Sequence, residues 1–310
     1  MSYQRDNRFI GSIVALALGD ALGAPYEGGP IERILWAFIG KRAGKRCWTD
    51  DTQMTLDVMA SLQANAGTIN QDDLARRFAG SYRWSRGYGA GTSRILRSIR
   101  HGMSWQDASR HAYRNGSFGN GGAMRAPVVG LCFANAGDTA ISKAANEVAS
   151  VTHAHPLAQE GAVLIALATA LTFNDVKTES LLARLEDRAE STEFKARLRK
   201  ASDWLSGSAR PDARGVAVGL GNSVAAAESC VTAIYTATAF LEHTFDDLLR
   251  FVIKIGGDVD TIAAMASAIW GAKHGLGALP AAQLQLLEGS ADIIASAREL
   301  AKKTINVQPV

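Results

Sequence analysis

Apolar residues recur at intervals of three and four along most of the chain. The first segment with this spacing contains Ile10, Ile13, Val14, Ala17, Leu18 and Ala21. The same spacing predicts further helices over residues 52–64, 71–82, 144–151, 157–171, 178–201, 224–241, 245–255 and 261–274. Strands would need a sustained alternation of apolar and polar residues, and such alternation is hard to find. The pattern therefore predicts an all-α fold.

Small residues form a second pattern within the first predicted helix. Gly11, Ala15, Gly19 and Gly23 fall four residues apart, which places them along one side of the helix. Because this side carries no bulky side chains, we expect another helix to approach it closely.

Glycine is concentrated in segments that lie between the predicted helices, at residues 23–29, 87–91, 116–122 and 256–257. Glycine adopts backbone conformations that other residues avoid, and it lets other groups come close. Loops of this kind often carry function. We therefore expect them to assemble a site at one end of a helical bundle.

The composition excludes several classes of protein. A chain of 310 residues with 47% hydrophobic residues can form one large domain or two small ones. The formal net charge is only +3 and the basic residues are scattered, whereas a nucleic-acid surface needs them clustered. The three cysteines are far apart, which argues against a zinc knuckle or a disulfide framework. No apolar run approaches the ~20 residues of a membrane span. We expect a cytoplasmic monomer that binds neither nucleic acid nor membrane.

Adjacent carboxylates stand just before the helix predicted over 52–64, in the segment Thr49-Asp50-Asp51-Thr52. Taken alone, this segment is a good helix start, because Thr49 or Asp50 can be the N-cap and the helix dipole favours acidic residues in the first turn. Capping therefore explains the segment without any further function.

A second segment of the same chemistry changes this interpretation. Asp258, Asp260 and Thr261 follow two glycines at the start of another predicted helix, which Gly275 ends. In an extended segment, Asp258 and Asp260 would point the same way. Capping needs one oxygen, so two such clusters predict a metal site shared by two helix starts. Carboxylate and hydroxyl oxygens suit Mg²⁺, Mn²⁺ or Ca²⁺ better than zinc or copper.

Three further features are candidates for chemistry. Glu27 is either a surface glutamate or a general base or acid beside a metal-bound water. The loop 116–122 has the exposed backbone N–H groups that can cradle phosphates, and its Phe118 either stacks on a base or fills the core. His153 and His155 could form a zinc pair, but a helix-start histidine that hydrogen-bonds a ligand is favoured.

These segments together resemble the ADP-ribosylglycohydrolase family. The resemblance rests on Gly19-Asp20-Ala21-Leu22-Gly23 with Glu27, on Trp48-Thr49-Asp50-Asp51-Thr52, on Gly119-Asn120-Gly121-Gly122-Ala123-Met124-Arg125, on Thr152-His153 and on Gly256-Gly257-Asp258-Val259-Asp260-Thr261. Each block is weakly specific, but all of them occur in family order from about residue 8 to 277. Residues 86–91 and Gly116-Ser117 look more like the serine-specific eukaryotic branch. Phe118 departs from the tyrosine of that branch, which keeps stacking and loses a hydroxyl.

The resemblance implies a single domain over residues 1–310, folded as a compact orthogonal bundle of α-helices. It also implies a centre of two Mg²⁺ or Mn²⁺ ions and assigns the site residues by position. The metal ligands would be Thr49, Asp50, Asp51, Asp258, Asp260 and Thr261. Glu27 would be the catalytic residue, and the ADP-ribose ligand would be bound by Gly116, Ser117, Phe118, Gly119, Asn120, Gly121, Gly122 and His153.

The expected activity is hydrolysis of the glycosidic bond between C1″ of ADP-ribose and an acceptor such as an arginine or serine side chain. The partner would then be an ADP-ribosylated protein or a small ADP-ribose conjugate. Two alternatives stay open. One is a hydrolase of free derivatives such as O-acetyl-ADP-ribose, and the other is a catalytically silent ADP-ribose-binding or structural member of the family.

Overall fold

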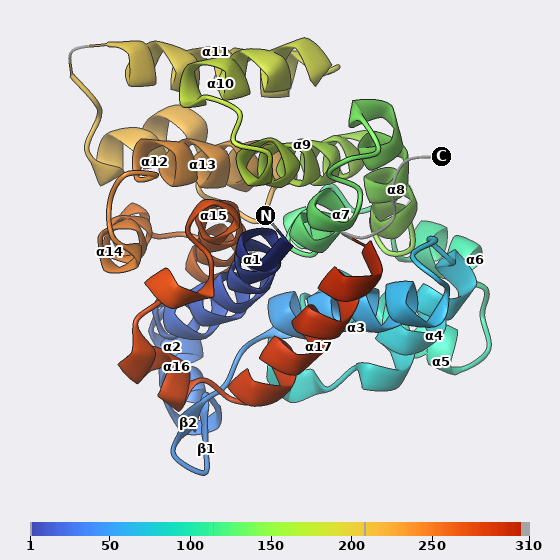
Figure 1. Ribbon diagram of the computed structural model, residues 1–310. Coiled ribbons are helices and arrows are strands. Elements are labelled where there is room, and N and C mark those ends of the chain that lie inside the picture. Colours follow the sequence, from blue (N-terminus) through green and yellow to red (C-terminus); the bar gives the residue numbers. More distant parts are fainter. Residues whose placement is uncertain (1, 114, 208, 305–310) are drawn as a thin grey trace.

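Helices make up nearly all of the regular structure in the computed structural model, which describes residues 2–113, 115–207 and 209–304 (Figure 1). The first half contains α1 (Ser2–Gly23), η1 (Ala24–Tyr26), α2 (Pro30–Ile39), α3 (Asp50–Ala64), α4 (Gln71–Ser81), η2 (Trp84–Arg86), α5 (Ala90–Arg100), α6 (Trp105–Ala112), η3 (Asn120–Gly122), α7 (Ala126–Cys132) and α8 (Asp138–Ser150). The second half contains α9 (Pro156–Phe173), α10 (Thr178–Arg188), α11 (Thr192–Ser206), α12 (Ala213–Leu220), α13 (Ala226–Ala239), α14 (Phe245–Ile255), α15 (Val259–His274), η4 (Leu276–Ala278), α16 (Ala281–Leu286) and α17 (Ser290–Thr304). A short antiparallel hairpin pairs β1 (Lys41–Arg42) with β2 (Lys45–Arg46). The all-α prediction is confirmed.

The centre of the molecule is the pair α1 and α15, which share the most extensive helix–helix contact among the described residues. Glycine makes this approach possible, as the small-residue pattern predicted. A Cβ on Gly19 would lie 2.5 Å from the carbonyl oxygen of Ala263, and one on Gly11 would lie 2.2 Å from the backbone of Gly275. Any larger side chain at either position would push the two helices apart.

The other helices surround this pair (Figure 1). In Figure 1, α9 and α13 run across the view above α1, and α10 and α11 form a further layer above them. The C-terminal helix α17 runs obliquely and packs on α1 and α3. Because α1 touches both α3 and α15, the starts of those two helices can meet at one end of the core.

One predicted helix is wrong and several helices were not predicted. The segment 178–201 forms two helices, α10 and α11, because the carboxylate of Glu160 accepts hydrogen bonds from the N–H groups of Glu190 and Ser191 between them. Ser191 then caps α11. The helices α2, α5, α6, α7, α12, α16 and α17 were not predicted. Several of these are short, so few apolar residues mark their spacing.

In the part of the chain that the structure describes, two helices are long and apolar enough to cross a membrane, contrary to the count made on the sequence. They are Tyr3–Tyr26 and Pro156–Phe173, and 89% and 78% of their most apolar windows are buried inside the fold. The sequence count missed them because alanine, glycine and threonine interrupt the bulky residues. Their burial is typical of the core helices of a globular fold.

Candidate active site

The start of α3 is built around Thr49. Its side chain accepts a hydrogen bond from the backbone N–H of Asp51 at 3.3 Å, which makes Thr49 the N-cap. Asp50 and Asp51 follow in the first turn, where the helix dipole favours negative charge. The predicted cap is therefore confirmed at Thr49. Because one hydroxyl completes the cap, both carboxylates are left for another task.

Asp20 forms hydrogen bonds with the start of α3, and the sequence analysis did not select it as a site residue. It lies in α1 with no exposed surface, and its carboxylate accepts bonds from the N–H of Thr49 at 2.9 Å, the N–H of Thr52 at 3.0 Å and the Thr52 hydroxyl at 2.5 Å. Burial raises the pKa of Asp20 to about 6, against the opposing effect of these bonds. They occupy most of the lone pairs of the carboxylate. Asp20 therefore positions the acidic residues of α3.

The start of α15 is arranged differently. Asp258 stands at the N-cap position, but its own side chain makes no capping bond, and the N–H of Thr261 donates instead to Asp260 Oδ1 at 2.8 Å. The carboxylate of Asp258 accepts a hydrogen bond at 2.5 Å from the side-chain amide of Asn120, which lies 138 residues earlier in the chain. The helix begins at Val259, so the extended segment assumed for Asp258 and Asp260 is wrong. The two carboxylates nevertheless converge, because the chain turns into the helix between them.

The two helix starts meet in space. The Thr261 hydroxyl donates to Asp51 Oδ1 at 3.4 Å, which links α15 directly to α3. Carboxylate oxygens of Asp20, Asp51 and Asp260 lie within 4.8 Å of one another, and so do those of Glu27, Asp258 and Asp260. Asp260 belongs to both groups. The predicted convergence of the two acidic clusters is therefore present.

The electrostatics of this cluster fit a divalent cation. Burial, followed by the charges of neighbouring carboxylates, raises the pKa of Asp50, Asp51 and Asp260 well above the usual value. The Oδ2 atom of Asp51 is buried without a hydrogen-bond partner among the described residues. A buried charge without a partner is costly unless it is paired or binds a metal. The donors are hard oxygens, which suit Mg²⁺, Mn²⁺ or Ca²⁺.

Glu27 faces the same cluster from a third segment. It follows the turn η1, which begins directly after α1 ends at Gly23, and its side chain is half-buried. Its charge contributes to the raised pKa of Asp50 and Asp260. A carboxylate at the edge of an acidic cluster can exchange protons with water beside the cluster.

A cavity of about 280 Å³ opens above the acidic cluster. The predicted site residues that line it are Glu27, Asp50, Asp51, Ser117, Gly119, Asn120, Gly121, His153, Asp258, Asp260 and Thr261. The predicted residues outside its lining are Thr49, Gly116, Phe118 and Gly122. Segments more than 200 residues apart thus supply one continuous wall.

The loop 116–122 offers fewer free N–H groups than the sequence suggested. The N–H groups of Gly116, Gly119 and Asn120 already donate to Tyr113, Ser117 and Val224. Gly116 (φ 77°) turns the chain, and a Cβ on Gly122 would lie 2.9 Å from that of Ala149. These glycines shape the loop, and their neighbours Ser117, Gly119 and Gly121 face the cavity.

Phe118 does not fill the core, which was one of its two interpretations from the local sequence. Its side chain is 55% exposed and its ring meets that of His155 edge-on at 6.2 Å. An exposed ring beside the loop is free to stack on a flat ligand.

His153 lies outside α9, and the histidine at the start of that helix is His155. His155 is the N-cap of α9, with Nδ1 accepting from the N–H of Leu157 at 3.2 Å. His153 is buried and packs against Gly121, where a Cβ would lie 2.8 Å from Nε2. Among the described residues, no group that could hold a metal contains a histidine. The zinc interpretation therefore gains no support.

Comparison with known proteins gives this architecture a family. The model of the family described as ADP-ribosylglycohydrolase matches residues 1–309. ADP-ribosylhydrolase ARH3 of Mus musculus is 32% identical, with 91% of this chain and 88% of its own length aligned. This chain belongs to the ADP-ribosylglycohydrolase family.

Further relatives agree with this assignment. ADP-ribosylhydrolase ARH3 of Homo sapiens is 31% identical over 93% of this chain and 92% of its own length. A solved structure, "ADP-ribosylglycohydrolase-related protein complex", has the same fold, with a TM-score of 0.73 at 24% identity over 97% of this chain and 99% of its own. The chain is accordingly a glycohydrolase, as the sequence resemblance predicted.

The acidic cavity is also lined by residues that the sequence analysis did not assign to the site. Gly87 and the first turn of α5 line it, together with Tyr113, Met124 and Val224. A Cβ on Gly91 would lie 2.2 Å from the Tyr113 hydroxyl, so glycine is needed there. The glycine-rich segment 87–91 was a usable signal for this wall. Nothing in the local sequence marks Tyr113, Met124 or Val224.

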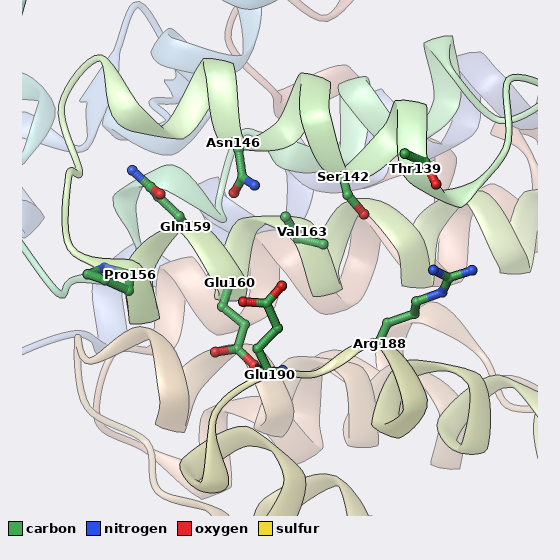
Figure 2. A pocket seen from close by; sticks show the side chains of 9 residues that line it. All are labelled: Thr139, Ser142, Asn146, Pro156, Gln159, Glu160, Val163, Arg188 and Glu190. Carbon is green, nitrogen blue, oxygen red and sulfur yellow. Dashed lines mark hydrogen bonds between the residues drawn. The ribbon is translucent and has the colours of Figure 1, made fainter.

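A hollow between α8 and α9 is no competing site. It holds about 320 Å³, and Figure 2 shows its polar side chains, with Arg188 at the end of α10 and Glu190 in the segment that joins α10 to α11. Glu160 is already bonded to that segment, and Arg188 pairs with Asp138 at 3.2 Å. These groups hold the outer helices to the core.

Proposed function

We propose that the protein hydrolyses the glycosidic bond between C1″ of ADP-ribose and an acceptor, and that it needs two Mg²⁺ or Mn²⁺ ions to do so. The observation that carries this proposal is the meeting of two acidic helix starts beneath one cavity. Asp51 Oδ2 has no partner among the described residues there, and the donors around it are oxygens. The family membership supplies the glycosidic bond as the target.

Each part of the cavity has a separate task in this proposal. Thr49, Asp50 and Asp51 would hold ions from α3, and Asp258, Asp260 and Thr261 from α15. Bound ions would supply positive charge for the ribose hydroxyls and lower the pKa of a water beside them. Asp20 and Asn120 orient these ligands through the hydrogen bonds described above.

Glu27 is the proton carrier of the proposed reaction. The oxygen of water forms a bond to C1″ while the bond from C1″ to the acceptor breaks, and the carboxylate of Glu27 takes the proton and returns it to the acceptor. The negative charges of the cluster tolerate the positive charge that develops on the ribose. On the ligand side, Ser117, Gly119, Gly121 and His153 would bind the diphosphate, and exposed Phe118 would stack on the adenine.

The test compares three substrates: arginine-linked, serine-linked and O-acetyl-ADP-ribose. Release of ADP-ribose is measured in EDTA and again after Mg²⁺ or Mn²⁺ is returned. We expect activity on at least one substrate, lost in EDTA and restored by metal. Asp258→Ala should stay inactive after metal is returned. Asp246→Ala is the matched control, because Asp246 also stands in the first turn of a helix but is exposed outside the cavity.

Three outcomes would redirect the proposal. Full activity of Asp258→Ala after metal is returned would contradict it. Calorimetry that finds no binding of Mg²⁺ or Mn²⁺ would favour a silent ADP-ribose-binding member. Activity on O-acetyl-ADP-ribose alone would make the protein a hydrolase of free metabolites.

A further inference from the structure

A second and larger cavity lies next to the active-site cavity. It holds about 570 Å³, against about 280 Å³ for the acidic cavity. Two segments of the chain connect the cavities. In the first, Cys47 lines the larger cavity and Asp50 the acidic one; in the second, Arg86 lines the larger cavity and Gly87 the acidic one. Between them the guanidinium of Arg86 stacks on the Trp48 ring at 3.5 Å. We call the larger cavity the basic groove.

The basic groove carries three cations that form no ion pair among the described residues. Arg86 pairs at 2.7 Å with Glu288, the one acidic residue among the described residues of the lining. Arg100 donates to backbone carbonyls of α4 and of Tyr82. Lys41, Arg42 and Arg83 are exposed, and none of them forms an ion pair or side-chain hydrogen bond with another described residue. Three free cations around one groove attract an anion with more than one charge, such as a diphosphate.

Exposed aromatic rings stand beside these cations. Trp84 is 72% exposed and Phe38 is 79% exposed, and both line the groove. Neither ring forms a ring–ring or cation–ring contact among the described residues. Base stacking on such rings is a common way to bind nucleotides. An acidic peptide would use the cations but give Trp84 no role.

We propose that the basic groove is a separate binding site for a purine nucleoside diphosphate. The base stacks on Trp84, and Lys41, Arg42 and Arg83 hold the diphosphate. The volume lies within the range of small-molecule sites. The site does not depend on the proposed hydrolysis, because none of these residues lines the acidic cavity.

The experiment counts ADP molecules bound to the full-length protein in Mg²⁺ by calorimetry. We expect two sites in the wild type, and the groove site weakened about tenfold or more in Trp84→Ala and in Arg83→Ala. Trp84→Phe should keep binding, since a ring remains. Arg298→Ala, an exposed arginine on α17, is the control and should change nothing. Truncating exposed side chains is expected to leave the fold intact.

Further arms identify the source of the nucleotide. If ADP-ribose binds at both sites, the basic groove accepts a conjugated nucleotide. If ADP binds in the groove and ADP-ribose does not, the groove accepts only a free nucleotide. A single ADP site that Trp84→Ala leaves unchanged would overturn the proposal. So would tighter binding of an oligoglutamate peptide that depends on Arg83 but not on Trp84.

A chain of buried hydrogen bonds behind the phosphate loop carries a second, independent inference. Arg125 has no exposed surface, and it donates to the carbonyl of Gly121 at 2.7 Å and to the hydroxyl of Thr152 at 2.9 Å. Thr152 Oγ1 lies 2.8 Å from Nδ1 of His153. Arginine can only donate, so the hydroxyl oxygen accepts from it. Among the described residues, the hydroxyl of Thr152 has one hydrogen-bond acceptor, which is Nδ1 of His153.

This chain determines the tautomer of His153. Because Nδ1 accepts, the proton lies on Nε2, which faces Gly121 at the wall of the active-site cavity. Burial, followed by the charge of Arg125, lowers the pKa of His153 to about 3, so the ring is neutral at physiological pH. We infer that Arg125 is a positioning residue that acts through Thr152 to present one N–H donor of His153 to a ligand oxygen. Only the ligand part of this inference rests on the proposed function.

Nitrogen NMR of the ¹⁵N-labelled protein tests the tautomer without any ligand. We expect His153 to show a protonated Nε2 and an unprotonated Nδ1 in the wild type. Thr152→Val should weaken this preference and raise KM more than it lowers kcat, and Thr152→Ser should restore both. A protonated Nδ1 in the wild type would overturn the inference, even if Thr152→Val failed to fold. An unchanged tautomer in Thr152→Val would also overturn it, whereas the expected tautomers in a wild type that hydrolyses none of the substrates would mean that only the proposed function is wrong.

Discussion

The two acidic helix starts solve the same problem in different ways. At α3, Thr49 caps the helix and leaves two carboxylates free. At α15, Asp258 occupies the N-cap position, yet its carboxylate is bonded to Asn120 and caps nothing. An unused N-cap side chain typically costs about 1 kcal/mol, of which the bond from the Thr261 N–H to Asp260 Oδ1 at 2.8 Å regains a part. The start of α15 therefore gives up stability for the position of a carboxylate, which is expected where a functional site overrides a local preference.

Both helix starts depend on residues that are distant in sequence. Asp20 of α1 anchors the start of α3, and the backbone carbonyl of Asn222 accepts the N–H of Asp258 at the start of α15. The first anchor is a buried carboxylate and the second is neutral. The acidic cluster thus gains one more negative charge on the α3 side. A bound cation would relieve repulsion most strongly there.

The largest expected effect is that of Asp258→Asn. The amide still fits beside Asn120 but is a poor metal ligand, so kcat/KM should fall by more than about 1,000-fold, since even groups that only orient ligands contribute 10–100-fold. In EDTA the same variant should melt at a higher temperature, because one of several buried, mutually repelling carboxylates is gone. Steady-state kinetics and thermal unfolding measure the two effects. Asp50→Asn, at the start of α3, should lower kcat/KM in the same way. If only one of the two variants loses activity, the two helix starts do not share a metal centre.

The sequence predicted what is local in this comparison. The apolar spacing located α3 and α15, and the threonine–aspartate segments marked their starts, because capping and dipole effects act within one turn. The small-residue pattern predicted the close approach to α1, since a glycine strip has few other uses in a helix. These parts require no knowledge of the tertiary structure.

The parts that were missed or wrong depend on contacts across the fold. Asp20 looked like any acidic residue inside a helix, and only its burial beneath Thr49 gives it a role. Asn120 reaches Asp258 across 138 residues, and no spacing rule covers such a pair. The local sequence left Phe118 open between the core and stacking on a base, because aromatic residues usually lie in the core, and only the structure shows that it is 55% exposed.

A further difference between the helices gives a prediction of intermediate size. Two turns along α3, Asp57 is buried and bonded to the Ser81 hydroxyl at 2.5 Å, and α15 has no such acid. Burial raises the pKa of Asp57 from 3.8 to about 7. The folded protein therefore binds this proton more tightly than the unfolded chain. Its stabilising contribution is complete below about pH 4 and is lost as the pH rises through about 7.

Asp57→Asn should remove this pH dependence. The unfolding free energy of the wild type should fall relative to the variant by on the order of 3 kcal/mol between pH 4 and pH 8. Denaturant unfolding of both proteins at each pH measures this difference. The acidic cluster is the same in both proteins, so its own pH dependence cancels when the two free energies of unfolding are subtracted. Parallel curves for the two proteins would show that Asp57 ionises at an ordinary pKa and that its burial has no effect on stability.

The smallest effect concerns the cap that α3 has and α15 lacks. In EDTA, Thr49→Val removes the acceptor for the N–H of Asp51 and should cost about 1 kcal/mol, while Thr49→Ser should cost only a few tenths. The same two variants, measured again in saturating Mg²⁺, separate the role of the hydroxyl as a cap from a role as a metal ligand. If Thr49 is also a metal ligand, the cost of Thr49→Val rises with metal, because the wild type gains more binding energy than the variant. An equal cost in EDTA and Mg²⁺ would leave Thr49 as a cap alone, and the metal would then be held only by carboxylates on the α3 side.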